Sequence, residues 1–167
     1  MSTTGILNWS IPKYSVRPIM SSYLIRKAEE RDCEGIARLT SQLGYPVSGE
    51  VMRPRLRRLL ASSSDVVFVA EAAQGGLVGW IHGVLSQFLE SDYRAEIGGV
   101  VVDDRFHRQG AGRGLVQRVE NWAVEHGVRC ATVRCRTTRP EAHFFYESLE
   151  YKQTKTQIVF RKSLSAD

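Results

Sequence analysis

Residues 107–114 read His-Arg-Gln-Gly-Ala-Gly-Arg-Gly (HRQGAGRG). The β-branched run before them, 95–102 (AEIGGVVV), predicts a strand, and apolar residues at helical spacing over 115–123 predict a helix directly after them. The first amides of a helix have no partner inside it, and the helix dipole adds positive potential there. Glycines let an anion approach the backbone, and Arg108 and Arg113 add charge. The stretch therefore predicts an anion-binding helix N-terminus, with glycines used only for close packing as the alternative.

Two familiar phosphate-binding motifs are excluded at this loop. A P-loop ends in Gly-Lys-Ser/Thr, whereas Gly112 is followed by Arg113 and Gly114. A dinucleotide-binding fingerprint needs glycine where Leu115 stands, and an acid at the end of the next strand, which residues 129–136 lack. The loop must hold its anion in another way.

Length and charge limit the classes of function. A chain of 167 residues suits one domain, and its formal net charge of +5 is compatible with an anionic ligand. Basic residues form no long run outside residues 53–58, so we expect no nucleic-acid partner. No apolar run approaches the roughly 18 residues of a membrane helix, so we expect no membrane association.

The three cysteines show no zinc-ligand spacing, so we expect small buried free thiols, no metal and a cytoplasmic location.

Residues 1–19 show no sustained periodicity and are expected to form a flexible extension, with the domain covering residues 20–167. Strands are predicted at 23–26, 65–73, 77–85, 95–102 and 129–136, with one or two more in 151–162. Helices are predicted at 32–43, 48–60, 115–127 and 140–149. The pair Gly98-Gly99 predicts a β-bulge or a close backbone approach in its strand. The order of elements predicts a mixed α/β fold.

Two motifs together resemble the GNAT superfamily of N-acetyltransferases. Gln109-Gly110-Ala111-Gly112, after a V-V-V-D strand end, resembles the superfamily's acyl-CoA loop, although His107 holds the position where arginine or glutamine is usual. Residues 139–151 (RPEAHFFYESLEY) resemble its A-x-x-F-Y-x-x-x-G-F/Y segment, with Glu150 in place of glycine. The resemblance covers roughly residues 22–162.

The resemblance implies a single-domain α/β fold. Its mixed sheet would have six to seven mostly antiparallel strands, splayed between the fourth and fifth, with about four flanking helices. It also implies direct transfer from acetyl-CoA to a primary amine of a small molecule or peptide, in a ternary complex and without metal. A non-catalytic acyl-CoA-binding regulatory module on the same fold is the alternative. Dimerisation through late strands is frequent in the superfamily, so a homodimer is considered.

The resemblance further assigns the donor site. Backbone groups of Val100 and Val102 would pair with the pantetheine amides, and an N–H near Val101 or Val102 would polarise the thioester carbonyl. The pyrophosphate would be held by the amides of Arg108, Gln109, Gly110, Ala111, Gly112 and Arg113.

The catalytic residues follow from the same comparison. Tyr146 resembles the tyrosine that protonates the departing thiolate, with a core aromatic as the alternative. Glu96 resembles the strand carboxylate that acts as general base in some members, with a partly buried, ion-paired glutamate as the alternative. His82 has a side chain suited to proton relay, but its position favours a hydrogen-bonded structural role. Trp80 and His82 share a strand face that would border the acceptor pocket.

In this superfamily the acceptor site is shaped by the first two helices with the loop between them, and by the segment after the third strand. The loop and the segment are residues 44–47 and 88–93 here. Glu90 and Asp92 would attract a cationic amine or, as the simpler alternative, are solvated loop acids.

Overall fold

The computed structural model describes residues 23–164, so the predicted extension at 1–19 lies outside the described residues. The strands are β1 (Tyr23–Lys27), β2 (Asp65–Ala72), β3 (Leu77–Phe88), β4 (Ser91–Val102) and β5 (Ala131–Val133). The α-helices are α1 (Cys33–Gln42), α2 (Gly49–Leu60), α3 (Ala111–Glu125) and α4 (Pro140–Glu147), with single 3-10 turns at Glu30–Asp32 and Asp104–Phe106.

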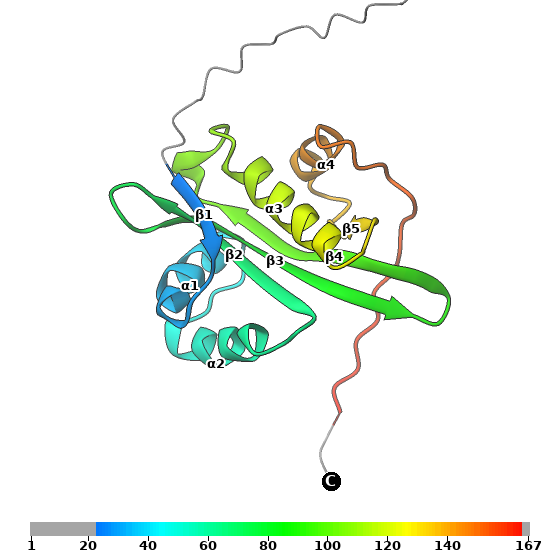
Figure 1. Ribbon diagram of the computed structural model, residues 1–167, viewed down its shortest axis with the longest axis horizontal. Coiled ribbons are helices and arrows are strands. Elements are labelled where there is room, and N and C mark those ends of the chain that lie inside the picture. Colours follow the sequence, from blue (N-terminus) through cyan, green and yellow to red (C-terminus); the bar gives the residue numbers. More distant parts are fainter. Residues whose placement is uncertain (1–22, 165–167) are drawn as a thin grey trace, which may run out of the picture.

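One sheet with the order β1-β2-β3-β4-β5 forms the centre of the fold (Figure 1). Neighbouring strands from β1 to β4 are antiparallel, whereas β5 runs parallel to β4. Helices α1 and α2 lie on one face of the sheet and α3 on the other (Figure 1). Side chains alternate along β3 accordingly. Ile81 is buried in the cluster that contains α3, and Trp80 packs against the cluster of α1 and α2.

The predicted count of six to seven strands is wrong, because the sheet of the described chain has five. Residues 151–162 were expected to supply the missing strands but form no ladder. Ile158, Val159 and Phe160 are 81%, 86% and 89% exposed, and the segment runs away from the body of the fold (Figure 1). A β-branched run favours extended backbone, but a strand also needs a partner edge, and this segment has none within the described chain. The fifth strand is likewise shorter than the predicted 129–136.

The hairpin of β3 and β4 is longer than predicted. Its strands extend to a tip at which Phe88 pairs with Ser91, so residues 88–93 form the end of this hairpin. Their role in an acceptor site stays a prediction. The apolar pattern used for prediction fades where the strands leave the core. Main-chain pairing continues there because it does not require apolar side chains.

The predicted bulge is confirmed at Gly98. His82 of β3 pairs with Gly99, and Gly83 with Ile97, which leaves Gly98 as the additional residue of β4. Pairing of β4 with β5 ends at the same place, since Ile97 with Val133 is the last pair although β4 continues to Val102. Pairing between β4 and β5 is therefore absent beyond Ile97, where β5 ends, and the splaying that the resemblance implied stays a prediction.

A buried carboxylate fixes the end of β4. Asp103 is 1% exposed and accepts hydrogen bonds from Arg38 of α1 at 2.8 Å and from Arg105 at 2.9 Å. The hydrogen bond from Arg105, and then that from Arg38, hold the pKa of Asp103 well below its ordinary value although burial acts in the opposite direction. These bonds tie α1 to the chain that enters the glycine loop.

We expect Asp103→Asn to lower the free energy of unfolding by about 1–3 kcal/mol at pH 7, because two guanidinium groups lose a charged acceptor. The folded-state pKa of Asp103 is depressed. Its stabilisation is therefore complete above the pKa of about 4 of an unfolded aspartate, and is lost as the pH falls below that value. Urea unfolding of both proteins should show a difference that shrinks between pH 7 and pH 3. An equal difference at both pH values would contradict this assignment.

Candidate active site

The N-terminus of α3 is an open set of backbone donors. Gly110 precedes the helix with a φ of 86°, in the left-handed region that favours glycine. The first helical hydrogen bond joins Gly114 N–H to Gly110 C=O at 2.9 Å, so the amides of Ala111, Gly112 and Arg113 have no acceptor inside the helix. The first turn holds no acid, and Gly110 offers no side chain as a cap. This end of the dipole is therefore uncompensated and suits an anion.

The other two glycines of the loop are needed for close packing. A Cβ on Gly112 would lie 3.2 Å from the Phe145 ring of α4, and a Cβ on Gly114 would lie 2.8 Å from Ile25 of β1. The two interpretations left open by the sequence thus hold together, because the same loop is tightly packed and has unpaired amides. The contact with Phe145 also places α4, which carries Tyr146, against the first turn of α3 (Figure 1).

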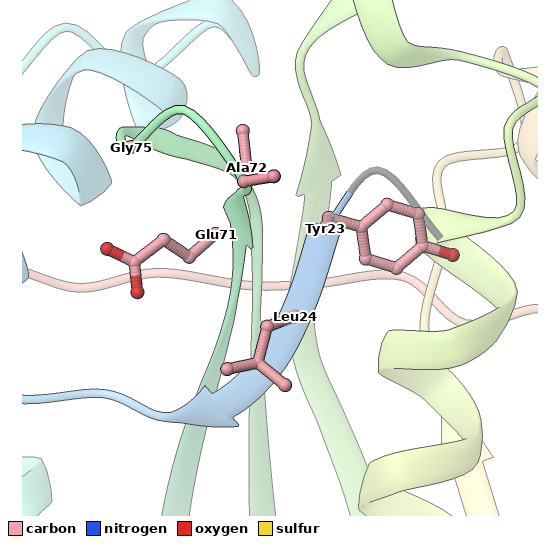
Figure 2. A pocket seen from close by; sticks show the side chains of 6 residues that line it. Tyr23, Leu24, Glu71, Ala72 and Gly75 are labelled. Carbon is pink, nitrogen blue, oxygen red and sulfur yellow. The ribbon is translucent and has the colours of Figure 1, made fainter. Parts of the chain in front are cut away.

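Tyr23 is a neighbour of the loop that the sequence did not reveal. Its ring extends from β1 toward α3 (Figure 2), and its hydroxyl lies 3.4 Å from the point that a Cβ on Gly110 would occupy. The hollow in Figure 2 is lined by Tyr23, Leu24, Glu71, Ala72, Ala73 and Gly75. None of the predicted site residues lines it, so we do not assign it to the active site.

The side chains of the loop are partly used by the protein itself. Arg113 donates to the carbonyl of Ser148 at the C-terminal end of α4, and Gln109 donates to the carbonyl of Arg105. Arg108 has a φ of 60°, a backbone conformation that is uncommon for residues other than glycine. The backbone amides, more than the cationic side chains, are what the loop offers to a ligand.

The bulge at Gly98 changes which backbone groups of β4 face β3 and which face β5. Before it, Ala95 N–H donates to the carbonyl of Cys130 beside β5. After it, Asp103 N–H donates to the carbonyl of Val78 on β3. Backbone groups of alternate residues point to the same edge of a strand, and both donors are odd-numbered. Before the bulge, the odd-numbered residues of β4 face β5. After it, because of the additional residue, the even-numbered residues face the gap between β4 and β5.

Beyond the bulge, the backbone groups of Val100 and Val102 face this gap. Val101 lies in the ladder with β3, opposite Trp80. The carbonyl of Val102 accepts a hydrogen bond from His107 Nε2 at 2.8 Å, a partner that we did not predict. The structure thus directs two of the three predicted valines toward the gap and one away from it.

Tyr146 occupies the core, which was the alternative for it, and its catalytic role stays a prediction. Its side chain is buried, and its ring lies 5.1 Å from that of Phe145 and 5.7 Å from that of Tyr151. Burial, with a smaller contribution from the Cys135 thiol, raises the pKa of Tyr146 to about 12. Among the described residues its hydroxyl has no hydrogen-bond partner. The ring is part of the core, while the protonated hydroxyl remains available to a ligand.

Glu96 adopts the ion-paired arrangement that was the alternative for it. Its side chain is 14% exposed, and its two oxygens each lie 3.1 Å from a guanidinium nitrogen of Arg134. It pairs with Thr132 of β5, one residue before the pairing of the two strands ends. On β3, His82 Nε2 lies 2.7 Å from Asp65 Oδ1, the hydrogen-bonded role that the sequence favoured.

The cysteines are free, but only Cys33 is buried as expected. Cys130 and Cys135 are exposed because β5 is shorter than predicted and both lie outside it. Within residues 23–164, no helix is long and apolar enough to cross a bilayer. Over the same range, no three His, Cys, Asp or Glu side chains gather as a metal site requires.

Comparison with known proteins decides the family, since the Acetyltransferase (GNAT) family profile matches residues 38–151, more than half of the chain. The chain belongs to the GNAT acetyltransferase family. It is accordingly an N-acetyltransferase that takes acetyl-CoA as its donor.

Similar proteins include aminoglycoside N(6')-acetyltransferase type 1 from Stenotrophomonas maltophilia. It is 27% identical over 150 residues, which cover 87% of this chain and 97% of that protein. The structure of aminoglycoside 6'-N-acetyltransferase AAC(6')-Ih from Acinetobacter baumannii has a TM-score of 0.76 at 18% identity, covering 86% and 99% of the two chains. AAC(6')-Iy in complex with the bisubstrate analog CoA-S-monomethyl-acetylneamine has the same TM-score and identity, with coverage of 85% and 99%. These two structures show the shared fold.

We expect Gly112→Glu to weaken CoA binding at least ~10-fold, because a carboxylate beside the unpaired amides of α3 repels the pyrophosphate. Isothermal titration calorimetry measures the change. Gly112→Gln controls for the bulk pressed against Phe145, and Gln117→Glu adds the same charge at an exposed position further along α3. If Gly112→Glu binds CoA as tightly as the unmodified protein, the loop does not hold the pyrophosphate.

Proposed function

We propose that this acetyltransferase acts on a primary amine of a small molecule or peptide, by direct transfer within a ternary complex, and that aminoglycosides are the first acceptors to test. The observation that carries the proposal is the uncompensated N-terminus of α3 directly after the strand that separates from β5. The similarity to two aminoglycoside N(6')-acetyltransferases, at 27% and 26% identity, supports this choice of acceptor.

On the donor side, the amides of residues 108–113 bind the pyrophosphate, and the backbone groups of Val100 and Val102 pair with the pantetheine arm. The amide of Val102, rather than that of Val101, faces the gap. We therefore assign to Val102 the N–H that polarises the thioester carbonyl.

In the reaction, the neutral amine attacks the thioester carbon, and the C–S bond breaks as the C–N bond forms. Tyr146 supplies the hydrogen bond or proton that the departing sulfur needs. A thiol has a pKa of about 8.5, far below the value of about 12 for Tyr146, so the phenol stays protonated and acts as a donor.

Glu96 was expected to be the general base, but both of its oxygens are bound by Arg134. A carboxylate in this arrangement still carries negative charge near the end of the β4–β5 pairing. We therefore propose that Glu96 attracts the ammonium group of the acceptor, and that it receives a proton only if Arg134 moves away.

We expect Tyr146→Phe to lower kcat about 100-fold with each accepted amine, because the hydroxyl serves the leaving group and not substrate binding. Release of the CoA thiol is followed with aminoglycosides, polyamines, amino acids and short peptides. Tyr151→Phe is the matched control. It removes a neighbouring, partly buried hydroxyl that already donates to Glu120 of α3 at 2.9 Å, so kcat should be retained.

Two results would count against this function. Thermal stabilisation by CoA without turnover of any amine indicates the regulatory module that was the alternative. Full kcat in Tyr146→Phe excludes the proposed role of its hydroxyl.

We also propose a homodimer in which residues 152–164 of each copy add a strand to the outer edge of β5 in the other copy. The described sheet ends at β5, so that edge is unpaired there, and the segment carries exposed Ile158 and Phe160 on one side of an extended chain. A free strand and a free edge in the same chain are self-complementary, which allows a closed two-fold pair.

Phe160→Glu should convert the dimer into a monomer, because it places a charge in the buried side of the added strand. Analytical ultracentrifugation measures the mass, and Lys155→Glu tests whether a charge change in the same segment suffices. A monomer at all concentrations for the unmodified protein would contradict the proposed exchange.

A further inference from the structure

The ring of His82 occupies space that exists only because Gly98 has no side chain. A Cβ on Gly98 would lie 2.8 Å from His82 Nδ1, a distance that real Cβ contacts do not show. Gly98 is the bulged residue of β4, at which the separation from β5 begins. His82 therefore places one ring nitrogen against the start of the gap. Its side chain is 23% exposed.

The other ring nitrogen is bound by a carboxylate. Nε2 of His82 lies 2.7 Å from Asp65 Oδ1, and Asp65 Oδ2 accepts a hydrogen bond from the hydroxyl of Ser62 at 2.5 Å. An ionised carboxylate accepts a hydrogen bond and cannot donate one, so Nε2 carries the proton in the neutral ring. Nδ1 then holds the lone pair. Among the described residues, no side chain donates to it.

We infer that His82 Nδ1 removes the proton from the acceptor's ammonium group, with Asp65 as the positioning residue; this rests on the proposed function. A carboxylate that fixes the tautomer of a histidine also stabilises the imidazolium formed when the opposite nitrogen is protonated. Position alone favoured a structural role for His82, and the structure shows that only one of its two nitrogens is used in that way.

The protons balance as follows. One ammonium proton moves to Nδ1 of His82 and is later released to solvent. The neutral nitrogen forms the C–N bond to the acetyl carbon, and the electron pair of the C–S bond leaves on sulfur. Tyr146 keeps its proton and donates a hydrogen bond to that sulfur, and the second proton of the attacking nitrogen is released to solvent.

Other charged groups lie on the same face of the sheet. They are Asp65 on β2, Arg94 and Glu96 on β4, and Arg134 beyond β5. Glu96 and Arg134 are paired with each other, and Arg94 lies over the ring of Phe88 toward the hairpin tip. Asp65 is the group that contacts the His82 ring, so it is the carboxylate that orients the ring.

The test is the pH dependence of kcat/KM with an amine that the unmodified enzyme acetylates. In His82→Gln we expect kcat to fall about 100-fold and the acidic limb of the profile to disappear, because protonation of His82 no longer removes the base. Affinity for CoA should be unchanged. In Asp65→Asn the ring remains but loses the acceptor that fixes its tautomer, so kcat should fall at least ~10-fold while the KM of the acceptor stays unchanged. Glu96→Gln should raise the KM of the acceptor and keep the limb.

The outcomes separate this inference from the function on which it rests. One result is that the unmodified enzyme turns over an amine while His82→Gln keeps the same kcat and pH profile. That result overturns the role of His82 and leaves the proposed function intact. Absence of turnover with every amine overturns the proposed function and this inference with it. If His82→Gln does not fold, as judged by circular dichroism and CoA binding, kcat in Asp65→Asn decides. An unchanged kcat in that variant rejects the assignment.

Discussion

One additional residue in β4 determines the geometry of the site. The bulge at Gly98 reverses which backbone groups face β5, and the pairing of the two strands ends at Ile97. Beyond that point the sheet has an inner edge with no neighbouring strand, toward which Val100 and Val102 direct their polar groups. An extended ligand with amide groups can pair there as another strand would. Glycine is needed at 98 for a second reason, since a side chain would displace the ring of His82.

The glycine loop depends on its supports as much as on its own composition. Asp103, buried between Arg38 and Arg105, fixes the chain before the loop, while Ile25 and Phe145 pack against Gly114 and Gly112. Arg113 binds the C-terminal end of α4, so its charge is used between helices. The first turn of α3 therefore keeps its amides unpaired on a rigid frame, which is the condition for binding an anion at little conformational cost.

The titratable groups around the gap between β4 and β5 differ in how many of their hydrogen-bonding atoms already have a partner in the protein. Both oxygens of Glu96 are bound by Arg134, whereas Tyr146 is buried with a hydroxyl that has no partner within the described chain. His82 lies between these cases, with one nitrogen bound and the other directed at the bulge. A group with a free lone pair or proton can take part in proton transfer, while a fully bound group acts mainly through its charge. This difference supports the roles proposed for these groups, which residue type alone leaves open.

Local patterns in the sequence determined the strand of 95–102, its bulge, the glycine loop and α3, because each depends on neighbours along the chain. The same patterns favoured strands at 151–162, which was wrong, and a strand over 129–136, which was too long. Local patterns fail here because a strand also requires a partner edge from elsewhere in the chain. Only the tertiary structure decided three contacts of the site. They are the hydrogen bond of His82 with Asp65, the ion pair of Glu96 with Arg134 and the contact of Tyr23 with the loop. The physical reason is that these contacts join residues on different strands and loops. Which groups meet is therefore set by the register and packing of the whole sheet.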